Sequence, residues 1–216
     1  MGIWTDHVTP RIAELTLRSK PIGALRAQAL SGLEGEVVEI GFGSGLNLRH
    51  YPASVSKVHA IEPSEVARRM AGPRAAASPI PVDFTGLDGQ ALPLDDESVD
   101  AAVSTFTLCT IPDVAAALGE LARVLRPGGR FHFLEHGRSD DPKVIAWQDR
   151  LNGVQGRIAG GCHLNRPIDA LIRSAGFEIE QLEQRYMPGP ALSKPFGYLY
   201  LGVARPASAV DRSEPR

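Results

Sequence analysis

The feature that most constrains the fold is a short strand pattern that leads directly into a glycine-rich loop. Val37-Val38-Glu39-Ile40 has the apolar, β-branched character of a buried strand, and Gly41-Phe42-Gly43-Ser44-Gly45 follows at once. Glycines let the backbone approach a ligand where any Cβ atom would clash, and amides before a helix favour polar ligand groups. The segment therefore predicts the first strand, loop and helix of an α/β fold, with a ligand at the loop.

The alternation of strand and helix patterns continues along the chain. Residues 113–126 carry apolar side chains at helical spacing, which predicts one buried helix face. Strand, helix and strand in this order are typical of a parallel sheet. The last two strand patterns are joined through Pro188-Gly189-Pro190 and predict an antiparallel hairpin. The expected strands are 37–40, 58–61, 81–85, 99–104, 131–136, 177–186 and 196–203, and further helices are expected at 64–77, 141–158 and 167–175.

Composition narrows the class of protein. The 23 basic and 25 acidic residues leave a net charge of −2, so the basic surface that nucleic-acid binders need is not expected. The sequence has two cysteines, no apolar run long enough to span a membrane and no signal-like segment. We therefore expect one globular domain in the reducing cytoplasm, without a transmembrane segment or a nucleic-acid partner. The four lysines among 23 basic residues are typical of a high-GC bacterial source.

Two acidic residues lie where a ligand of an open α/β sheet is expected. Glu39 precedes the glycine loop and Glu62 directly follows the second strand. At the carboxyl ends of such strands a carboxylate can accept hydrogen bonds from two ribose hydroxyls. Leu46 stands where a dinucleotide fingerprint would have its third glycine, which disfavours pyrophosphate binding. The alternatives are that Glu39 is a helix-cap partner or a buried acceptor for loop amides, and that Glu62 favours the next helix's N-terminus.

These segments in this order resemble the class I S-adenosylmethionine-dependent methyltransferases of the type 11 kind. The resemblance covers roughly residues 35–136 and rests on the glycine loop, on Glu62-Pro63-Ser64 and on the fourth and fifth strand segments. It implies a Rossmann-like α/β fold: a seven-stranded sheet with the last strand antiparallel, helices on both faces and an N-terminal helical cap. S-adenosyl-L-methionine would be the cofactor, and S-adenosyl-L-homocysteine the released product.

The same resemblance implies a role for each cofactor-binding candidate. The glycine loop would hold the methionine and ribose parts, Glu62 the ribose, and Asp88-Gly89 the adenine edge. An ordinary Asx turn is the alternative for Asp88. The full set of cofactor candidates is Glu39, Gly41, Phe42, Gly43, Gly45, Glu62, Pro63, Asp88, Gly89 and Thr105.

Four further segments are similar to the methyltransferase-like thiol S-methyltransferases. They are Thr107-Leu108-Cys109-Thr110-Ile111, Arg123-Val124-Leu125-Arg126-Pro127-Gly128-Gly129, Phe133-Leu134-Glu135-His136 and Gly161-Cys162-His163-Leu164-Asn165-Arg166. This similarity implies methyl transfer to a small acceptor, with a thiol as the leading choice. A quinol, another small carbon or oxygen acceptor, or a phospholipid amine is the alternative with the same cofactor.

Two histidines are the candidate catalytic residues, because an imidazole can raise the thiolate fraction of an acceptor thiol. His136 follows the fifth strand and His163 lies in a glycine-rich insert, and either could instead be structural. Asn165 and Arg166 are candidates for substrate binding, with capping of the next helix as the alternative. Cys109 and Cys162 are expected to be buried small residues, since their spacing shows no metal motif and no metal site is predicted.

Functions of another class remain open at this stage. A nicotinamide-dependent oxidoreductase shares the fold type, but Leu46 and the terminal hairpin disfavour it. A non-catalytic module that only binds the cofactor is a further alternative.

The expected organisation is a single methyltransferase domain over residues 1–205. It divides into an N-terminal helical cap at 1–32, with a helix break at Pro21, a cofactor-binding half at 33–136 and an acceptor side at 137–205. Residues 206–216 are expected to be a disordered tail. The cap is amphipathic and basic, which is compatible with weak association with a membrane surface.

Overall fold

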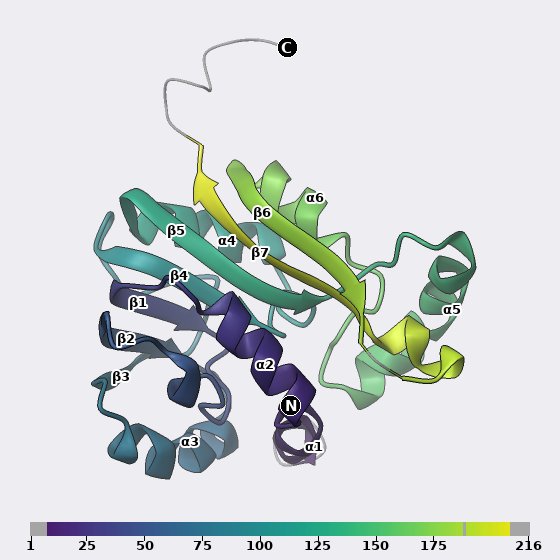
Figure 1. The fold of residues 1–216 in the computed structure, drawn as a ribbon, viewed down its shortest axis with the longest axis horizontal. Helices are drawn as coiled ribbons and strands as arrows, with labels where there is room; N and C mark the ends of the chain where they lie inside the picture. Colours follow the sequence, from purple (N-terminus) through teal and green to yellow (C-terminus); the bar gives the residue numbers. More distant parts are fainter. Residues whose placement is uncertain (1–7, 188, 208–216) are drawn as a thin grey trace.

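The computed structural model describes residues 8–187 and 189–207, and its centre is a seven-stranded sheet with the strand order β3-β2-β1-β4-β5-β7-β6 (Figure 1). The strands are β1 (Gly35–Ile40), β2 (Val55–Ile61), β3 (Val82–Gly86), β4 (Val99–Thr105), β5 (Leu125–His136), β6 (Phe177–Tyr186) and β7 (Tyr198–Pro206). The helices are α1 (Thr9–Leu17), α2 (Lys20–Ala29), α3 (Glu65–Ala77), α4 (Val114–Val124), α5 (Pro142–Ile158) and α6 (Ile168–Ser174), with short 3₁₀ turns η2 (Leu48–His50) and η3 (Ala191–Phe196).

The strand pairing confirms the expected Rossmann-like topology. Strands β1 to β5 pair in parallel, whereas β7 runs antiparallel to both β5 and β6. The chain reverses its direction across the sheet between β1 and β4, which are neighbours in the sheet. At such a switch point the carboxyl ends of two adjacent strands open a crevice, and ligands of α/β sheets bind there. The topology therefore places the ligand beside the loops that follow β1 and β4.

Helices cover both faces of the sheet, with α2 in front and α4 and α6 behind it in Figure 1. The predicted apolar face of α4 is confirmed. Leu118 and Leu121 lie on the same side of the helix because of their spacing, and both are fully buried against the sheet. On the other face, Leu25 of α2 packs with Leu134 and Leu199. Burying apolar area on both faces holds the strand ends, and the loops that leave them, in fixed positions.

The break between the first two helices lies earlier than expected. Helix α1 ends at Leu17 and α2 begins at Lys20, so Pro21 is in the first turn of α2 rather than at the break. A proline is tolerated there because the first N–H groups of a helix have no partner within the helix. At the other end of the chain, the prediction of a disordered tail from residue 206 is wrong at its start, because β7 runs to Pro206 and pairs there with β6; residues 208–216 of that tail lie outside the described residues.

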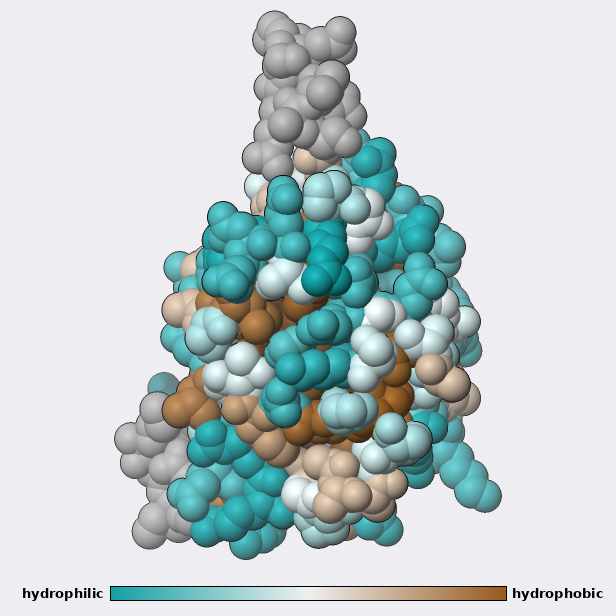
Figure 2. All heavy atoms as spheres, turned by 90° about the vertical axis from the view of Figure 1, so that its left-hand side faces the viewer, coloured by the Kyte–Doolittle hydropathy of each residue, from teal (hydrophilic) through white to brown (hydrophobic). Residues whose placement is uncertain are grey.

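The length and polarity of the helices bear on whether one of them could span a membrane. Over the described part of the chain, every helix is too short or too polar to cross a bilayer. Figure 2 faces the left-hand side of Figure 1, and there polar side chains break up the exposed apolar area.

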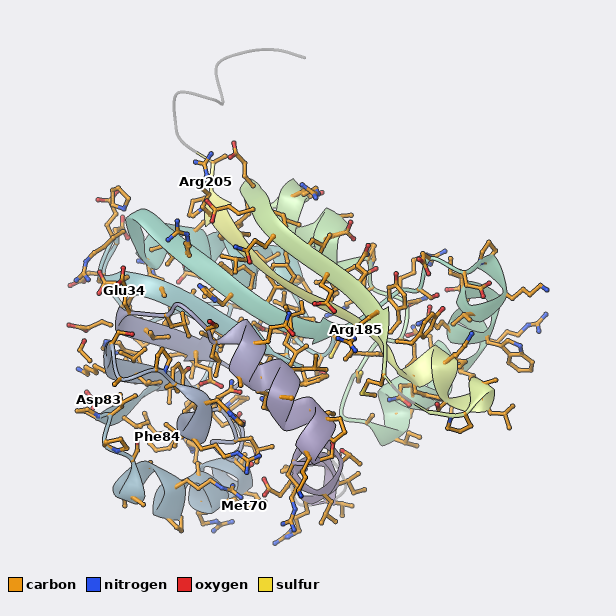
Figure 3. The ribbon with its side chains drawn as sticks, viewed as in Figure 1. Glu34, Met70, Asp83, Phe84, Arg185 and Arg205 are labelled. Carbon is orange, nitrogen blue, oxygen red and sulfur yellow. The ribbon has the colours of Figure 1, made fainter. Side chains whose placement is uncertain are left out.

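On β6, Arg185 pairs with Glu183, which also accepts a hydrogen bond from Gln28 of α2 (Figure 3). This contact links α2 to the terminal hairpin.

Candidate functional site

The glycine loop after β1 is held by backbone hydrogen bonds from the neighbouring strand. The amides of Gly41 and Phe42 donate to the carbonyl of Ile61 at 2.9 and 3.1 Å. Gly41 has a positive φ of 69°, and a Cβ atom there would lie 1.9 Å from Thr107 Oγ1. Gly43 also has a positive φ of 59°, but a Cβ atom there would meet nothing closer than 3.8 Å. Gly41 therefore permits close packing, and Gly43 leaves space in front of the loop.

Glu62 binds the same loop from the end of β2. Its Oε2 accepts a hydrogen bond from the amide of Gly43 at 2.7 Å, and its Oε1 accepts one from the amide of Ser64 at 2.7 Å. Burial raises the pKa of the Glu62 carboxyl above its ordinary value, and the two amide donors oppose that shift. Each carboxylate oxygen can accept a second hydrogen bond, so Glu62 can hold the loop and also bind a ligand hydroxyl.

Glu39 is fully buried and is occupied by side chains of its own chain. Asn47 Nδ2 donates to Glu39 Oε1 at 2.7 Å, and the Tyr51 hydroxyl donates to Oε2 at 2.6 Å. Burial raises the pKa of Glu39 to about 7, although both hydrogen bonds favour the ionised form. The structure thus places Glu39 beneath the loop as a buried acceptor, and its partners are side chains rather than loop amides.

Arg26 of α2 lies over the carboxyl ends of β1 and β4. It is 4% exposed, and its Nη1 donates to Asn47 Oδ1 at 2.7 Å and to Thr105 Oγ1 at 2.9 Å. Its guanidinium also lies 5.4 Å from the ring centre of Phe106, which has a positive φ of 56°. Burial lowers the pKa of Arg26, yet an arginine stays charged. This is a buried cation beside the glycine loop.

Two buried side-chain nitrogens have no hydrogen-bond partner among residues 8–187 and 189–207, and both lie at this edge of the sheet. They are Arg26 Nε and His136 Nε2. Leaving a buried polar atom unpaired costs about 1–3 kcal/mol, so an unpaired atom in a folded protein calls for an explanation. A bound polar ligand would satisfy such atoms.

The first helix also contacts the loop. Glu14 of α1 accepts hydrogen bonds from the Ser44 hydroxyl and from Arg74 Nη2, the latter at 2.6 Å. Arg74 Nη1 in turn donates to the Ser44 carbonyl at 2.7 Å. The first helix therefore touches the glycine loop through Glu14, and the second helix reaches Asn47 just after the loop and Thr105 at the end of β4 through Arg26.

The remaining cofactor candidates differ in how they lie. The Phe42 ring is buried and packs edge-on against the ring of Phe84 of β3 (labelled in Figure 3), with 5.5 Å between the two ring centres. Phe42 therefore contributes its backbone, rather than its ring, to the ligand side of the loop. Gly45 closes the loop with a positive φ of 77°. Pro63 is exposed. Thr105, the last residue of β4, is buried and accepts the Arg26 hydrogen bond described above.

Asp88 and Gly89 lie in the loop between β3 and β4. Asp88 is exposed, and its Oδ1 accepts hydrogen bonds from the amide and the side chain of Gln90 at 2.9 and 2.8 Å. The side-chain hydrogen bond from Gln90 is the main reason that the pKa of Asp88 is lowered. Gly89 is buried, and a Cβ atom there would lie 3.1 Å from Ile111. The Asx turn given as the alternative for Asp88 is therefore present.

Glu135, the buried residue before His136, shapes the loop after β4. Its Oε1 accepts from the Ser104 hydroxyl at 2.6 Å and from the Thr107 amide at 3.0 Å, and its Oε2 accepts from the Cys109 amide at 3.4 Å. Burial raises the pKa of Glu135 above its ordinary value. One carboxylate thus fixes the loop that carries Thr107 against Gly41.

His136 ends β5 and faces a cysteine. It is 6% exposed, and its Nδ1 lies 3.9 Å from Cys162 Sγ. The thiol of Cys109 and the nearby His136 ring lower the pKa of Cys162, whereas the pKa of Cys109 is raised well above its ordinary value. The sequence prediction that both cysteines are plain packing residues missed this juxtaposition.

His163, Asn165 and Arg166 are engaged within the chain. His163 Nδ1 lies 3.3 Å from Asn152 Nδ2, and burial lowers the pKa of His163. Asn165 Nδ2 donates to Asp149 at 2.7 Å. Arg166 Nη1 donates to the carbonyls of Leu108 and Ile111 in the loop after β4. The capping alternative for Asn165 and Arg166 is wrong, because the N-cap of α6 is Pro167 and no side chain caps it.

The hollow that Asn165 and Arg166 line lies on the outer side of the loop after β4. It has a volume of about 630 Å³ and is bounded on its other side by residues 112–115. Their side chains thus lie where a molecule at the surface could reach them, and Arg166 at the same time anchors the loop that leads to Cys109.

Comparison with known proteins agrees with this geometry. The sequence profile of a family described as a methyltransferase domain matches residues 38–133. The thiol S-methyltransferase TMT1B of Rattus norvegicus is 32% identical over 183 residues, which cover 81% of this chain and 73% of that protein. This chain belongs to the class I S-adenosylmethionine-dependent methyltransferases.

Two further comparisons, one of sequence and one of structure, show how much of this methyltransferase each similarity covers. The ubiquinone/menaquinone biosynthesis C-methyltransferase UbiE of Methylobacterium nodulans is 43% identical, but over 77 residues that cover 36% of this chain and 29% of that protein. The crystal structure of an S-adenosylmethionine-dependent methyltransferase from Mesorhizobium loti superposes with a TM-score of 0.61 at 23% identity, covering 87% of this chain and 98% of that one.

The residues at the crevice fit S-adenosylmethionine. The space in front of Gly43 can take part of the cofactor, and the Glu62 carboxylate has free lone pairs that can accept hydrogen bonds from the ribose hydroxyls. The methionine part carries a carboxylate, and Arg26 offers a buried cation with an unpaired N–H group. Sequence reasoning noted Arg26 only as one basic residue of an amphipathic segment, because its partners are far away in the sequence.

Proposed function

We propose that this methyltransferase transfers the methyl group of S-adenosylmethionine to the sulfur of a small thiol. The observation that carries the proposal is the likeness to a thiol S-methyltransferase over 81% of this chain, which is more than the cofactor half can account for. The likeness to quinone-biosynthesis methyltransferases extends over 36% to 55% of the chain, which is less than the thiol S-methyltransferase match. A quinol acceptor is therefore the second candidate.

The cofactor supplies an electrophilic methyl group on a sulfonium sulfur, so displacement needs chiefly a nucleophile in line with it at near-attack distance. The chain provides that alignment from two sides. Glu62 and the amides of the glycine loop hold the nucleoside half, and Arg26 holds the amino-acid half from above. Because Arg26 and Thr105 share a hydrogen bond of 2.9 Å, the end of β4 is positioned together with the cap.

The acceptor belongs beside the ends of β4 and β5. His136 lies there with Nε2 buried and unpaired, which makes it the better of the two histidine candidates for contact with an acceptor. His163 already faces Asn152 and is the weaker candidate. A thiol of ordinary pKa has some thiolate at neutral pH, so the site has to desolvate and orient the sulfur more than it has to provide a strong base.

The deciding experiment offers several acceptors to the purified protein with methyl-labelled S-adenosylmethionine. We expect label in the thioether product of 2-mercaptoethanol or ethanethiol, and none when the sulfur is already methylated. A reduced short-chain quinol and phosphatidylethanolamine vesicles run beside it. Label in the quinol or the lipid and none in either thiol would overturn the thiol proposal.

His136→Asn provides the matched test of the acceptor side. It should lower methyl transfer to the thiol while S-adenosylhomocysteine binding, measured by calorimetry, stays unchanged, because His136 is placed at the acceptor and not at the glycine loop. Loss of cofactor binding in this variant would contradict that placement.

A further inference from the structure

Three side chains that can bind a metal ion meet at the acceptor side of the site. Cys109 follows β4, His136 ends β5 and Cys162 follows α5. One ligand atom of each, the two sulfurs and an imidazole nitrogen, lies within 4.8 Å of the others. All three residues are buried or half-buried, so bulk water does not separate them.

Backbone contacts hold the three residues together. The amide of His163 donates to the carbonyl of Cys109 at 2.8 Å, which joins the Cys162 loop to the loop after β4. His136 is fixed by the antiparallel pairing of β5 with β7. Gly161 has a positive φ of 94°, which lets the loop turn so that Cys162 reaches the other two. The cluster is thus built by three separate segments of the fold.

We propose that Cys109, His136 and Cys162 form a three-ligand site for a thiophilic divalent cation such as Zn²⁺. Two thiolates and one imidazole are a donor set that this class of ion prefers. Zinc–sulfur bonds of about 2.3 Å and zinc–nitrogen bonds of about 2.0 Å place tetrahedral ligand atoms roughly 3.5–3.8 Å apart. The observed 3.9 Å between Cys162 Sγ and His136 Nδ1 needs a contraction of tenths of an ångström, and the widest separation in the cluster, within 4.8 Å, needs one of about 1 Å at most.

The same geometry assigns the histidine nitrogens. Nδ1 faces Cys162 and would bind the ion, so the proton of the neutral ring lies on Nε2. Nε2 is the buried nitrogen without a partner among the described residues, and as an N–H group it can donate to a water molecule or another polar group beside the ring. The nitrogen that would bind the ion and the unpaired N–H group therefore lie on different edges of one ring.

Three protein ligands leave the fourth tetrahedral position open, as in catalytic zinc sites. With the thiol acceptor proposed above, on which this step rests, that position would take the acceptor sulfur. The thiol loses its proton to solvent on binding. The bound sulfur then forms a bond to the methyl carbon while the carbon–sulfonium bond breaks, and a thioether and S-adenosylhomocysteine leave. Coordination would thus supply the deprotonated sulfur without a separate general base.

In the test, Co²⁺ alone is added to the reduced, metal-free protein, because the absorption spectrum of bound Co²⁺ depends on its ligands and its geometry. We expect saturable binding of one ion, visible bands of tetrahedral strength and a near-ultraviolet thiolate-to-metal band. Zn²⁺ should displace the Co²⁺ and abolish both. Elemental analysis of protein purified without chelator should then find zinc bound in proportion to protein.

Variants assign the ligands without using activity. Cys109→Ser and Cys162→Ser should each weaken Co²⁺ binding at least tenfold and reduce the thiolate band, and His136→Asn should weaken binding while leaving that band. His163→Asn, next to Cys162 in the same loop, is the matched control and should leave the spectrum unchanged. Circular dichroism and S-adenosylhomocysteine binding show whether each variant is folded.

Two results would overturn the metal site. One is Co²⁺ binding that is absent, or unaffected by the cysteine variants, in protein whose two thiols react as free thiols. The other is ready formation of a Cys109–Cys162 disulfide on exposure to air in protein that binds no metal, which would make the cluster a redox pair.

A last measurement separates the metal site from the thiol proposal. Adding ethanethiol to the Co²⁺ protein should strengthen the thiolate band if the acceptor sulfur takes the fourth position, and ethanol should not. An unchanged band would overturn that part of the proposal and leave the three-ligand site standing. If thiols are not methylated while the Co²⁺ spectra are intact, the proposed function is overturned and the three-ligand metal site still stands.

Discussion

Glu62 Oε2 accepts a hydrogen bond of 2.7 Å from the backbone amide of Gly43. This contact joins the acid after β2 to the centre of the loop after β1, and it points the loop toward the crevice at the switch point of the sheet. The amide of Ser64 binds the other oxygen, so the carboxylate cannot rotate away from the loop without losing a partner. A single residue thus sets the loop conformation and leaves lone pairs for the ribose.

Glu62→Ala should weaken S-adenosylhomocysteine binding by about 1–3 kcal/mol, because it removes the ribose acceptor and frees the Gly43 amide. Calorimetry on the purified variant measures the change directly. Glu65→Ala is the matched control, since Glu65 starts α3 three residues later and forms an ion pair with Arg69 on the exposed surface. Equal affinities for wild type and Glu62→Ala would show that Glu62 does not bind the cofactor.

Gly43→Ala tests whether the space in front of the loop belongs to the cofactor. The added methyl group meets no protein atom closer than 3.8 Å, but it enters the space assigned to the ligand. We expect at least about tenfold weaker S-adenosylhomocysteine binding, or about 1.4 kcal/mol, in a folded protein. Gly128→Ala is the control, because Gly128 also has a positive φ and open space around it.

Both glycine variants should lose about 1–2 kcal/mol of unfolding free energy in urea, since an L-residue is strained at positive φ. Only Gly43→Ala should lose cofactor affinity as well. If both variants bind the cofactor normally, the space in front of Gly43 is not its site.

The parts of the site that could be predicted from the sequence are those that short stretches determine. A strand pattern followed by Gly41 and Gly43 specifies a loop at a strand end, and an acid such as Glu62 after the next strand is read in the same way. Helical spacing likewise predicted the buried face of α4. In each case the physical cause lies within about a dozen residues.

The parts that could not be predicted depend on contacts between distant segments. Arg26 binds Thr105, which is 79 residues away, and nothing in the basic N-terminal pattern distinguishes Arg26 from its neighbours. Cys109 and Cys162 show no metal-type spacing, yet the fold brings their two loops together with His136 at the end of β5. Arg166 was expected at the substrate, but the loop carbonyls of Leu108 and Ile111 need donors, and the guanidinium provides them.

Glu39 should make the stability of the protein pH-dependent. Burial raises the pKa of Glu39 from 4.5 to about 7, so between these values the folded state binds a proton that the unfolded state releases. The stabilisation is fully present below pH 4.5 and is lost as the pH rises through 7. Each unit of pKa difference corresponds to about 1.4 kcal/mol.

Glu39→Gln removes this titration while keeping an acceptor for the Tyr51 hydroxyl. We expect urea unfolding of the wild type to lose on the order of a few kcal/mol relative to the variant between pH 5 and pH 7.5. Other buried carboxyls, including Glu62 and Glu135, titrate in both proteins and cancel in the difference. A difference that does not change with pH would mean that Glu39 is ionised throughout this range.

Arg26 provides the sharpest test of how the cap recognises the cofactor. If its unpaired Nε and its charge meet the methionine carboxylate, Arg26→Ala should weaken S-adenosylhomocysteine binding by about 1.5–3 kcal/mol. 5′-Methylthioadenosine has the same nucleoside but lacks the amino acid, so its affinity should stay unchanged. Arg26→Lys, which keeps the charge, should fall between the two. Equal losses for both ligands would mean that Arg26 acts only by holding Asn47 and Thr105 in place, because a carboxylate contact can discriminate only between ligands that differ in the carboxylate.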